Sequence, residues 1–269
     1  MPNFHSDGWV HEQLNRHKQF ALSLYSEDRI VGIFCQGSTN YGLDTKDSDF
    51  DSKCIVVPTF KDIALTRKPV STTHILPNDE HCDGKDVRLY METFRKQNLN
   101  FLEILFTDYC WINPLYEKQW ARLVEKRELI ARMNEFRAVK SMKGIAMEKY
   151  HAMEHPYPSK VEVLAKYHYD PKQLHHLLRI EEYIGRYIDG VDYADCLKPL
   201  HPSYLVDVKN GKYDLETARV IAISAKENVE RIANHFCAWH EDKEDKVCRE
   251  LLEDVCYEIM KIAVEEEIK

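Results

Sequence analysis

The spacing of hydrophobic residues divides the chain into a mixed first part and a helical second part. Apolar residues between Gly8 and Ser26 recur three, four and seven positions apart, which predicts an amphipathic helix. The pattern then changes, because residues 29–35 form a short apolar run that ends at Gly37, as a buried strand does when it enters a turn. Three further strands are predicted at 49–57, 72–76 and 86–91, the last from its alternation of polar and apolar residues. These segments predict a small mixed sheet.

From residue 92 onward the pattern is helical almost to the end of the chain. Helices are predicted at 92–106, 114–127, 134–153, 160–167, 171–188, 214–239 and 244–266. Asp170 and Pro171 give one helix an N-cap acceptor followed by a proline at its first position, whereas 191–213 is rich in loop residues. The sequence therefore predicts an α+β fold, with a sheet-bearing domain and N-terminal helix at 1–111 and an α-helical bundle at 112–269.

The composition is that of an ordinary globular protein, with 269 residues, 44 % hydrophobic and 30 % charged. It excludes collagen-like, coiled-coil-only and disordered chains. No stretch approaches the roughly 18 to 20 consecutive apolar residues of a membrane span, and the N-terminus lacks a basic segment followed by an apolar one. We therefore expect a cytoplasmic protein with no membrane partner, whose eight cysteines are reduced thiols.

Charge is unevenly distributed around a net value of -8. Residues 241–267 contain eleven acids and four bases, so they contribute most of the excess negative charge. Residues 122–149 contain eight bases and four acids, a local surplus that suits a phosphate-bearing ligand or, alternatively, a solvated helix face.

The segment 36–51 carries the candidate chemistry: a Gly-Ser turn follows the first strand, and acids follow at Asp44, Asp47, Asp49 and Asp51. A Walker phosphate loop is excluded because Leu43 stands where its lysine should be. A calcium-binding EF-hand that starts at Asp47 is excluded because its sixth and twelfth positions are Ser52 and Pro58, and no Gly-x-Gly-x-x-Gly fingerprint occurs.

Strand geometry favours a metal site. Asp49 and Asp51 are two residues apart, so their carboxylates point to the same side of a strand. Two neighbouring carboxylates repel each other unless a hard divalent cation lies between them, and Mg²⁺ suits such oxygen ligands together with substrate phosphates. Asp86 opens the next alternating strand and is the candidate third acid, while Gly37 and Ser38 offer backbone N–H groups and a hydroxyl to an anion. The pattern predicts phosphoryl transfer.

The pair Gly37-Ser38, followed by Asp49-x-Asp51, resembles the signature of the DNA polymerase beta-like nucleotidyltransferase superfamily. The runs 37–42 and 48–51 are similar to a bacterial and phage branch of orphan predicted nucleotidyltransferases. Three later runs extend the resemblance, at 86–90, at 98–105, where Leu99 replaces the usual proline, and at 170–179. The matches cover roughly residues 30–235.

The resemblance implies an enzyme that transfers a nucleoside monophosphate from a nucleoside triphosphate, such as ATP, to a hydroxyl acceptor and releases pyrophosphate. Asp49, Asp51 and Asp86 would hold two Mg²⁺ ions, with Mn²⁺ as an alternative. Gly37 and Ser38 would bind phosphates, and His176 and Arg179 would contact the nucleotide from the helical half. An RNA end, a small molecule and a protein side chain remain candidate acceptors, and base preference and oligomeric state stay open.

Each assignment has a structural alternative. The acids of 44–51 could form a solvated turn, and Asp86 could be a strand-end residue in an ion pair with Arg88. His176 and Arg179 could satisfy carboxylates such as Glu182. A catalytically inactive nucleotide-binding or partner-binding module of the same fold is the alternative function, and the acidic C-terminal helices could be a partner surface or a solvated face.

Overall fold

The computed structural model describes residues 4–46 and 48–269, and it contains one five-stranded mixed sheet in the order β3-β4-β2-β1-β5. The strands are β1 (Ile30–Gln36), β2 (Asp51–Val56), β3 (Ser71–Ile75), β4 (His81–Asp86) and β5 (Cys110–Ile112). β1 pairs with β2 and β5 antiparallel, β3 pairs with β4 antiparallel, and β2 and β4 are parallel. With the helices given below, this arrangement confirms the predicted α+β class.

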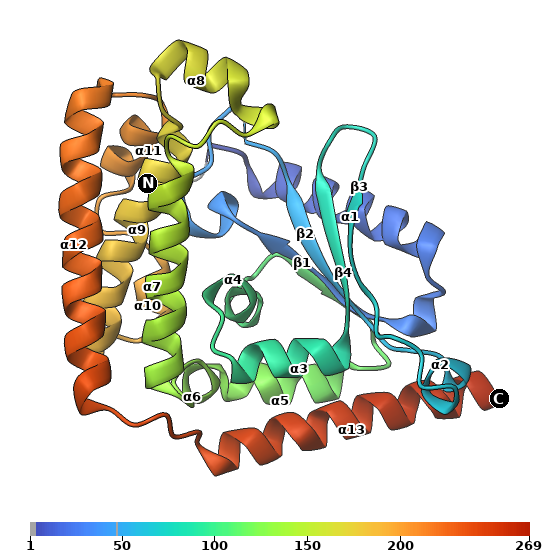
Figure 1. Cartoon of the computed structure of the whole chain (residues 1–269). Coiled ribbons are helices and arrows are strands. Elements are labelled where there is room, and N and C mark those ends of the chain that lie inside the picture. The colour runs from blue at the N-terminus through green and yellow to red at the C-terminus, as the bar shows by residue number, and fades with distance from the viewer. Residues whose placement is uncertain (1–3, 47) are drawn as a thin grey trace. The chain divides into compact units, whose positions relative to one another are not determined.

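Helices make up most of the rest of the chain (Figure 1). The α-helices are α1 (Asp7–Leu24), α2 (Phe60–Ala64), α3 (Val87–Arg95), α4 (Leu99–Leu102), α5 (Glu117–Glu125), α6 (Arg127–Ala131), α7 (Glu135–Ala152), α8 (Val161–Tyr167), α9 (Pro171–Ile188), α10 (Tyr193–Leu197), α11 (Pro202–Lys209), α12 (Leu215–Trp239) and α13 (Lys246–Ile268). Short 3-10 turns are η1 (Glu27–Arg29), η2 (Ser38–Tyr41), η3 (Glu103–Leu105) and η4 (Pro158–Lys160).

The strand predicted at 86–91 is wrong. Asp86 is the last residue of β4, and its side chain caps α3 by accepting a hydrogen bond from the backbone N–H of Arg88. The buried residues of α3 are Val87, Tyr90, Met91 and Phe94, spaced three, one and three apart, as on one side of a helix. Alternation over six residues could not distinguish this helix from a strand, and the true strand before it, His-Cys-Asp-Gly-Lys-Asp, has little hydrophobic signal.

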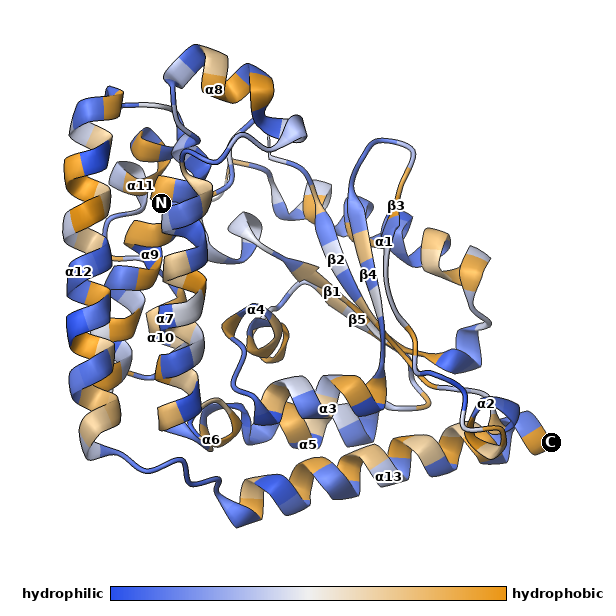
Figure 2. Ribbon diagram, in the orientation of Figure 1, coloured by the Kyte–Doolittle hydropathy of each residue, from blue (hydrophilic) through white to orange (hydrophobic). Residues whose placement is uncertain are grey.

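The chain forms two compact units, whose limits differ from the predicted domains 1–111 and 112–269. The sheet unit comprises 4–40, 44–134 and 244–269, and the helical unit comprises 41–43 and 135–243. Residues 112–134 and the last helix belong to the sheet unit because α13 packs against α5 and α3 (Figure 1). Hydrophobic and hydrophilic residues alternate in patches along α13, as expected for a helix with one packed side (Figure 2).

In the sheet unit, α1 covers one face of the sheet. Buried side chains of this layer include Val10, Leu14 and Ala21 from α1 and Cys54 and Cys82 from the central strands. α3 and α4 cover the opposite face, and the residues of α4 other than Asn100 are hydrophobic (Figure 2). Successive strand residues alternate between these two faces. Because Cys54 and Cys82 face α1, their neighbours Lys53 and Asp83 face the opposite side.

In the helical unit, α7, α9 and α12 pack against one another, and α11 packs against α9. α9 begins where the sequence predicts, because Asp170 accepts a hydrogen bond from the backbone N–H of Lys172 and Pro171 occupies the first helical position. Tyr183, Tyr187 and Tyr193 are fully buried and their rings contact one another. The loop-rich segment 191–213 contains two short helices, α10 and α11, that the hydrophobic spacing did not predict.

In the part of the chain that the structure describes, no helix has both the length and the apolar character needed to cross a membrane.

Candidate functional site

The Gly-Ser turn follows β1 in a conformation that requires glycine. Gly37 has a φ of 89°, in the left-handed region where side chains with a Cβ are strained. The next residue, Ser38, begins η2, and Asn40 fixes this turn because its amide donates to the carbonyl of Cys35 at 3.0 Å. Thr107 in turn donates to the Asn40 side chain at 2.6 Å. Within the described residues, the Ser38 hydroxyl makes no hydrogen bond, so the turn presents it without an internal partner.

The register of β1 and β2 brings the turn beside the predicted acids. Gln36, which precedes Gly37, pairs with Asp51 at the start of β2. Phe50 is buried beneath α1, whereas Asp49 is exposed and Asp51 is partly exposed. Because neighbouring residues of extended chain point to opposite sides, Asp49 and Asp51 lie on the side away from α1. The structure thus places Gly37, Asp49 and Asp51 at one end of the sheet, which we call the Asp51 end.

The Asp51 carboxylate is oriented by β4. Its Oδ1 accepts a hydrogen bond from the backbone N–H of His81 at 2.9 Å and lies 3.3 Å from Nδ1 of the same residue. The preceding residue, Glu80, is held from α1, because His17 Nε2 lies 2.9 Å from Glu80 Oε2 and Arg16 pairs with the same carboxylate. Two residues of α1 therefore fix the start of β4, which in turn fixes Asp51.

The same histidine contacts Ser52, whose Oγ lies 2.8 Å from His17 Nδ1. The chain of contacts from Glu80 through His17 to Ser52 is that of the acid, histidine and serine of a hydrolytic triad. However, His17 and Ser52 are 0 % exposed. A substrate cannot reach them, so we interpret this network as structural. Sequence reasoning missed it, although His17 lies three residues after Leu14 and four before Ala21 on the buried side of α1.

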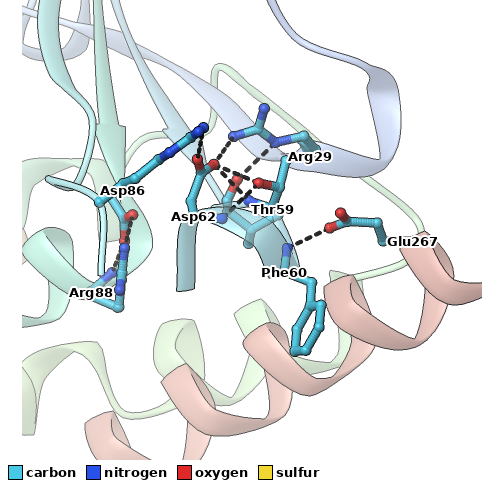
Figure 3. Close-up of polar contacts among 9 residues, drawn as sticks. Arg29, Thr59, Phe60, Asp62, Asp86, Arg88 and Glu267 are labelled. Carbon is cyan, nitrogen blue, oxygen red and sulfur yellow. Dashed lines mark hydrogen bonds and ion pairs between the residues drawn. The ribbon is translucent and has the colours of Figure 1, made fainter. Parts of the chain in front are cut away.

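Asp86 does not meet Asp49 and Asp51. It pairs with Val56 at the other end of β2, five residues beyond Asp51, or about 16 Å along the strand. Arg88 donates to both of its oxygens, from Nε at 2.9 Å and from Nη2 at 2.7 Å, and Asp86 is 1 % exposed (Figure 3). This geometry corresponds to the structural ion pair that the sequence left as an alternative.

Asp83 lies closer to the place where a third acid was expected. It pairs with Lys53, which shares a face with Asp51, so Asp83 is on that face and two residues along the neighbouring strand. Its Oδ1 accepts a hydrogen bond from Thr73 at 2.7 Å, and its Oδ2 lies 3.8 Å from Lys53 Nζ. Burial lowers the pKa of Lys53 to about 8, and Lys85 lowers it further, although Asp83 opposes the shift.

Of the other acids in the motif, Asp44 has a structural role. Its carboxylate accepts hydrogen bonds from the backbone N–H groups of Phe4 at 3.0 Å and His5 at 2.8 Å, so it anchors the start of the chain. Asp47 lies outside the described residues. The interpretation of the segment as a solvated turn therefore fails for Asp44, which is buried.

His176 and Arg179 belong to α9 in the helical unit. Burial lowers the pKa of His176, and the neighbouring His175 and Arg179 lower it further, which favours a neutral ring at pH 7. The guanidinium of Arg179 lies 3.6 Å from the centre of the Tyr41 ring, at the last residue of η2. Their predicted contact with a nucleotide stays a prediction.

The basic segment 122–149 is divided between the two units, and several of its bases have acidic partners. Ion pairs are formed by Arg122 with Glu258, Lys126 with Glu125, Arg137 with Asp242 and Lys149 with Glu148. This pairing favours the solvated-face interpretation over a dedicated phosphate surface.

Comparisons with known proteins leave the family open. No family model matches the chain, and no curated protein matches it. Among solved structures, the chain is similar to a crystal structure of a nucleotidyltransferase-like protein from Exiguobacterium sibiricum 255-15, at 10 % identity and a TM-score of 0.28. The match covers 96 % of this chain and 78 % of the other. A likeness at this TM-score establishes neither the fold nor the activity of this chain.

The donor set at the Asp51 end fits a hard divalent cation that keeps water ligands. Asp49 and Asp51 offer carboxylate oxygens on the same side of the chain, and both are accessible to solvent. Across residues 4–46 and 48–269, no three histidine, cysteine or acidic side chains converge closely enough to hold an ion by themselves. The fit is therefore to an ion shared with a ligand, as Mg²⁺ is with phosphates, and not to a closed protein cage.

Proposed function

We propose that this protein transfers a nucleoside monophosphate from a nucleoside triphosphate to a hydroxyl acceptor, with release of pyrophosphate. The observation that carries the proposal is the β1–β2 register, which pairs Gln36, the residue before Gly37, with Asp51. A turn that offers backbone N–H groups and a hydroxyl is suited to phosphate oxygens, and paired acids beside it are suited to the cation that accompanies a triphosphate.

Each residue at this end of the sheet has a separate task in the proposal. Gly37 and Ser38 bind the terminal phosphates, and Asp49 and Asp51 hold Mg²⁺, or Mn²⁺ in its place. His81 keeps Asp51 in one orientation, and Asp83 takes the role of third acid that the sequence assigned to Asp86. A divalent cation held there neutralises charge that develops on the reacting phosphoryl group and the departing pyrophosphate.

The side chains of α9 are assigned by the motif alone. His176 and Arg179 contact the nucleotide in this proposal, His176 as a neutral hydrogen-bonding group and Arg179 as a cation. Replacement of Arg179 by methionine is then expected to raise the KM for the triphosphate more than it lowers kcat.

The experiment is incubation of the purified protein with each α-labelled triphosphate and Mg²⁺, in the presence of RNA, protein or small-molecule fractions of a cell extract. Label in one fraction, with equal pyrophosphate release, supports the transfer and identifies the acceptor class. Asp49→Ala is the matched control, because Asp49 is exposed and its loss leaves the core unchanged.

A folded wild-type protein that releases no pyrophosphate with any triphosphate and fraction contradicts the proposal. Binding of triphosphate without release would instead support the alternative, an inactive nucleotide-binding module. Transfer that persists in Asp49→Ala would refute the assignment of the cation to this pair of acids.

A further inference from the structure

Two lysine ammonium groups lie on one aromatic ring, on the sheet face that carries Asp51. Lys53 follows Asp51 by two residues on β2, and Lys85 lies on the neighbouring strand β4. The centre of the Phe101 ring is 4.5 Å from Lys53 Nζ and 3.9 Å from Lys85 Nζ. The two nitrogen atoms cannot be farther apart than the sum of these distances, so two positive charges share one small region.

The protein compensates this charge only in part. Among the described residues, the contact of Lys53 with Asp83 is the one ion pair that either lysine makes, and its 3.8 Å exceeds a hydrogen-bond length. Lys53 is 3 % exposed, and a buried charge without a close partner is costly. The electron-rich face of Phe101 offsets part of that cost when no anion is bound.

The cluster is partly accessible to solvent. Lys85, Phe101 and Asp83 are each partly exposed, so a small ligand can approach the ring and the second lysine without unfolding the sheet unit. Asp83 and Asp51 lie on the same face, which places the cluster beside the proposed cation ligands. An anion that binds there would therefore be part of the same reaction site.

We propose that Lys53, Lys85 and Phe101 form a binding position for a phosphate group of a nucleotide substrate. The inference rests on the proposed function and adds to it a phosphate contact separate from the Gly37-Ser38 turn. Each ammonium is a flexible point charge with three N–H donors, which suits phosphate oxygens. The phosphate belongs either to the triphosphate donor or to a nucleic-acid acceptor, beside its reacting hydroxyl.

The test measures binding of two probes in Mg²⁺ by calorimetry, without turnover: pyrophosphate, and a short RNA that ends in a 3′-hydroxyl. Lys85→Met is the main variant because Lys85 is only partly buried, and Lys53→Met is the second. Lys18→Met is the matched control, since Lys18 Nζ lies 3.9 Å from the ring centre of Trp111 in the same unit, away from β2 and β4. Lys85→Arg keeps the charge.

We expect Lys85→Met to bind one of the two probes about tenfold more weakly than wild type does. The affinities of Lys18→Met and Lys85→Arg for both probes should stay within about twofold of wild type. If Lys85→Met loses affinity for pyrophosphate, the bound phosphate belongs to the triphosphate donor. If it loses affinity for the RNA, the phosphate belongs to the nucleic-acid acceptor. Unchanged affinity for both probes in Lys85→Met and Lys53→Met, with wild-type melting temperatures, would overturn the inference.

The two proposals can fail separately. A wild-type protein that binds a probe through Lys85 but transfers no label supports the phosphate position and contradicts the transferase. A protein that transfers label while Lys85→Met binds and reacts normally supports the transferase and overturns the phosphate position.

Discussion

The two ends of the β2–β4 pair carry acids in very different surroundings. At one end, Asp51 is partly exposed, and the backbone N–H of His81 donates a hydrogen bond that orients its carboxylate. At the other end, Asp86 is 1 % exposed, accepts two hydrogen bonds from the Arg88 guanidinium and caps α3 (Figure 3). Availability to a ligand therefore depends on burial and on internal partners, which residue type alone does not determine.

The same contrast applies across the two faces of the sheet. On the α1 face, His17, Glu80 and Ser52 satisfy one another in a closed network. On the opposite face, Lys53 and Lys85 share the Phe101 ring, and Lys53 lies 3.8 Å from the carboxylate of Asp83. A polar cluster whose groups find hydrogen-bond partners within the protein stabilises the fold. A solvent-accessible cluster whose charges are only partly compensated is a candidate for binding a ligand.

The largest expected effect separates the two ends by activity. Asp51→Asn should lower the rate of pyrophosphate release by about a hundredfold to a thousandfold, since it removes charge that faces the reacting phosphates. Asp86→Asn, measured below its unfolding transition, should stay within about threefold of wild type because its carboxylate contacts Arg88 instead of the substrate. Comparable losses in the two variants would mean that both ends belong to the site.

The next effect concerns the stability of the same two variants, where Asp86→Asn should lose more than Asp51→Asn. Asp86→Asn should lower the free energy of unfolding by about 2 kcal/mol, because it leaves Arg88 without its carboxylate and weakens the cap of α3. The Arg88 side chain is 34 % exposed, so the loss is smaller than for a fully buried pair. Asp51→Asn should change stability by less than about 0.5 kcal/mol. Urea unfolding of both variants checks this order, and an equal loss would contradict it.

An effect of similar size extends the comparison to the helical unit. Burial lowers the pKa of His175 to about 4, with a contribution from Arg179, although its Nδ1 lies 2.8 Å from the carbonyl oxygen of Leu205 and this hydrogen bond opposes the shift. The unfolded chain protonates this ring near pH 6.5 and the folded one only near pH 4, so protons favour unfolding in that range. The contribution to stability is complete above pH 6.5 and is lost as the pH falls toward 4.

Between pH 7.5 and pH 5 this residue should account for a loss of about 2 kcal/mol. Urea unfolding at both pH values measures it, and His175→Gln is the control, because its amide can still donate to the Leu205 carbonyl but does not titrate. If wild type and His175→Gln lose the same stability, burial of a neutral His175 is not the cause.

The long helices were largely predictable because their spacing and caps are local signals. α9 has the limits that Asp170 and Pro171 predict, and the first strand lies within one residue of its predicted limits. β5 and α2 were not predicted because three and five residues carry too little periodicity. The place of α13 in the sheet unit depends on packing with α3 and α5, which no local pattern shows.

The candidate site was predictable only within one stretch of chain. Gly37, Ser38, Asp49 and Asp51 are joined by a turn and one strand, so their proximity follows from sequence spacing. The third acid comes from another strand, and its choice depends on the parallel register of β2 and β4. That register pairs Asp83 with Lys53 and leaves Asp86 at the far end, a result that alternation in the sequence could not supply.

The most direct test of the central claim is to locate the bound cation by paramagnetic broadening of backbone amide signals, with Mn²⁺ and a triphosphate added to the isotope-labelled protein. We expect signals of residues 36–38, 49–53 and 81–83 to broaden first and those of 86–88 to persist, because the proposed cation binds at the Asp51 end of the sheet. Broadening centred on 86–88, or no selective broadening at any ratio of Mn²⁺ to protein, would contradict a cation site formed by Asp49 and Asp51.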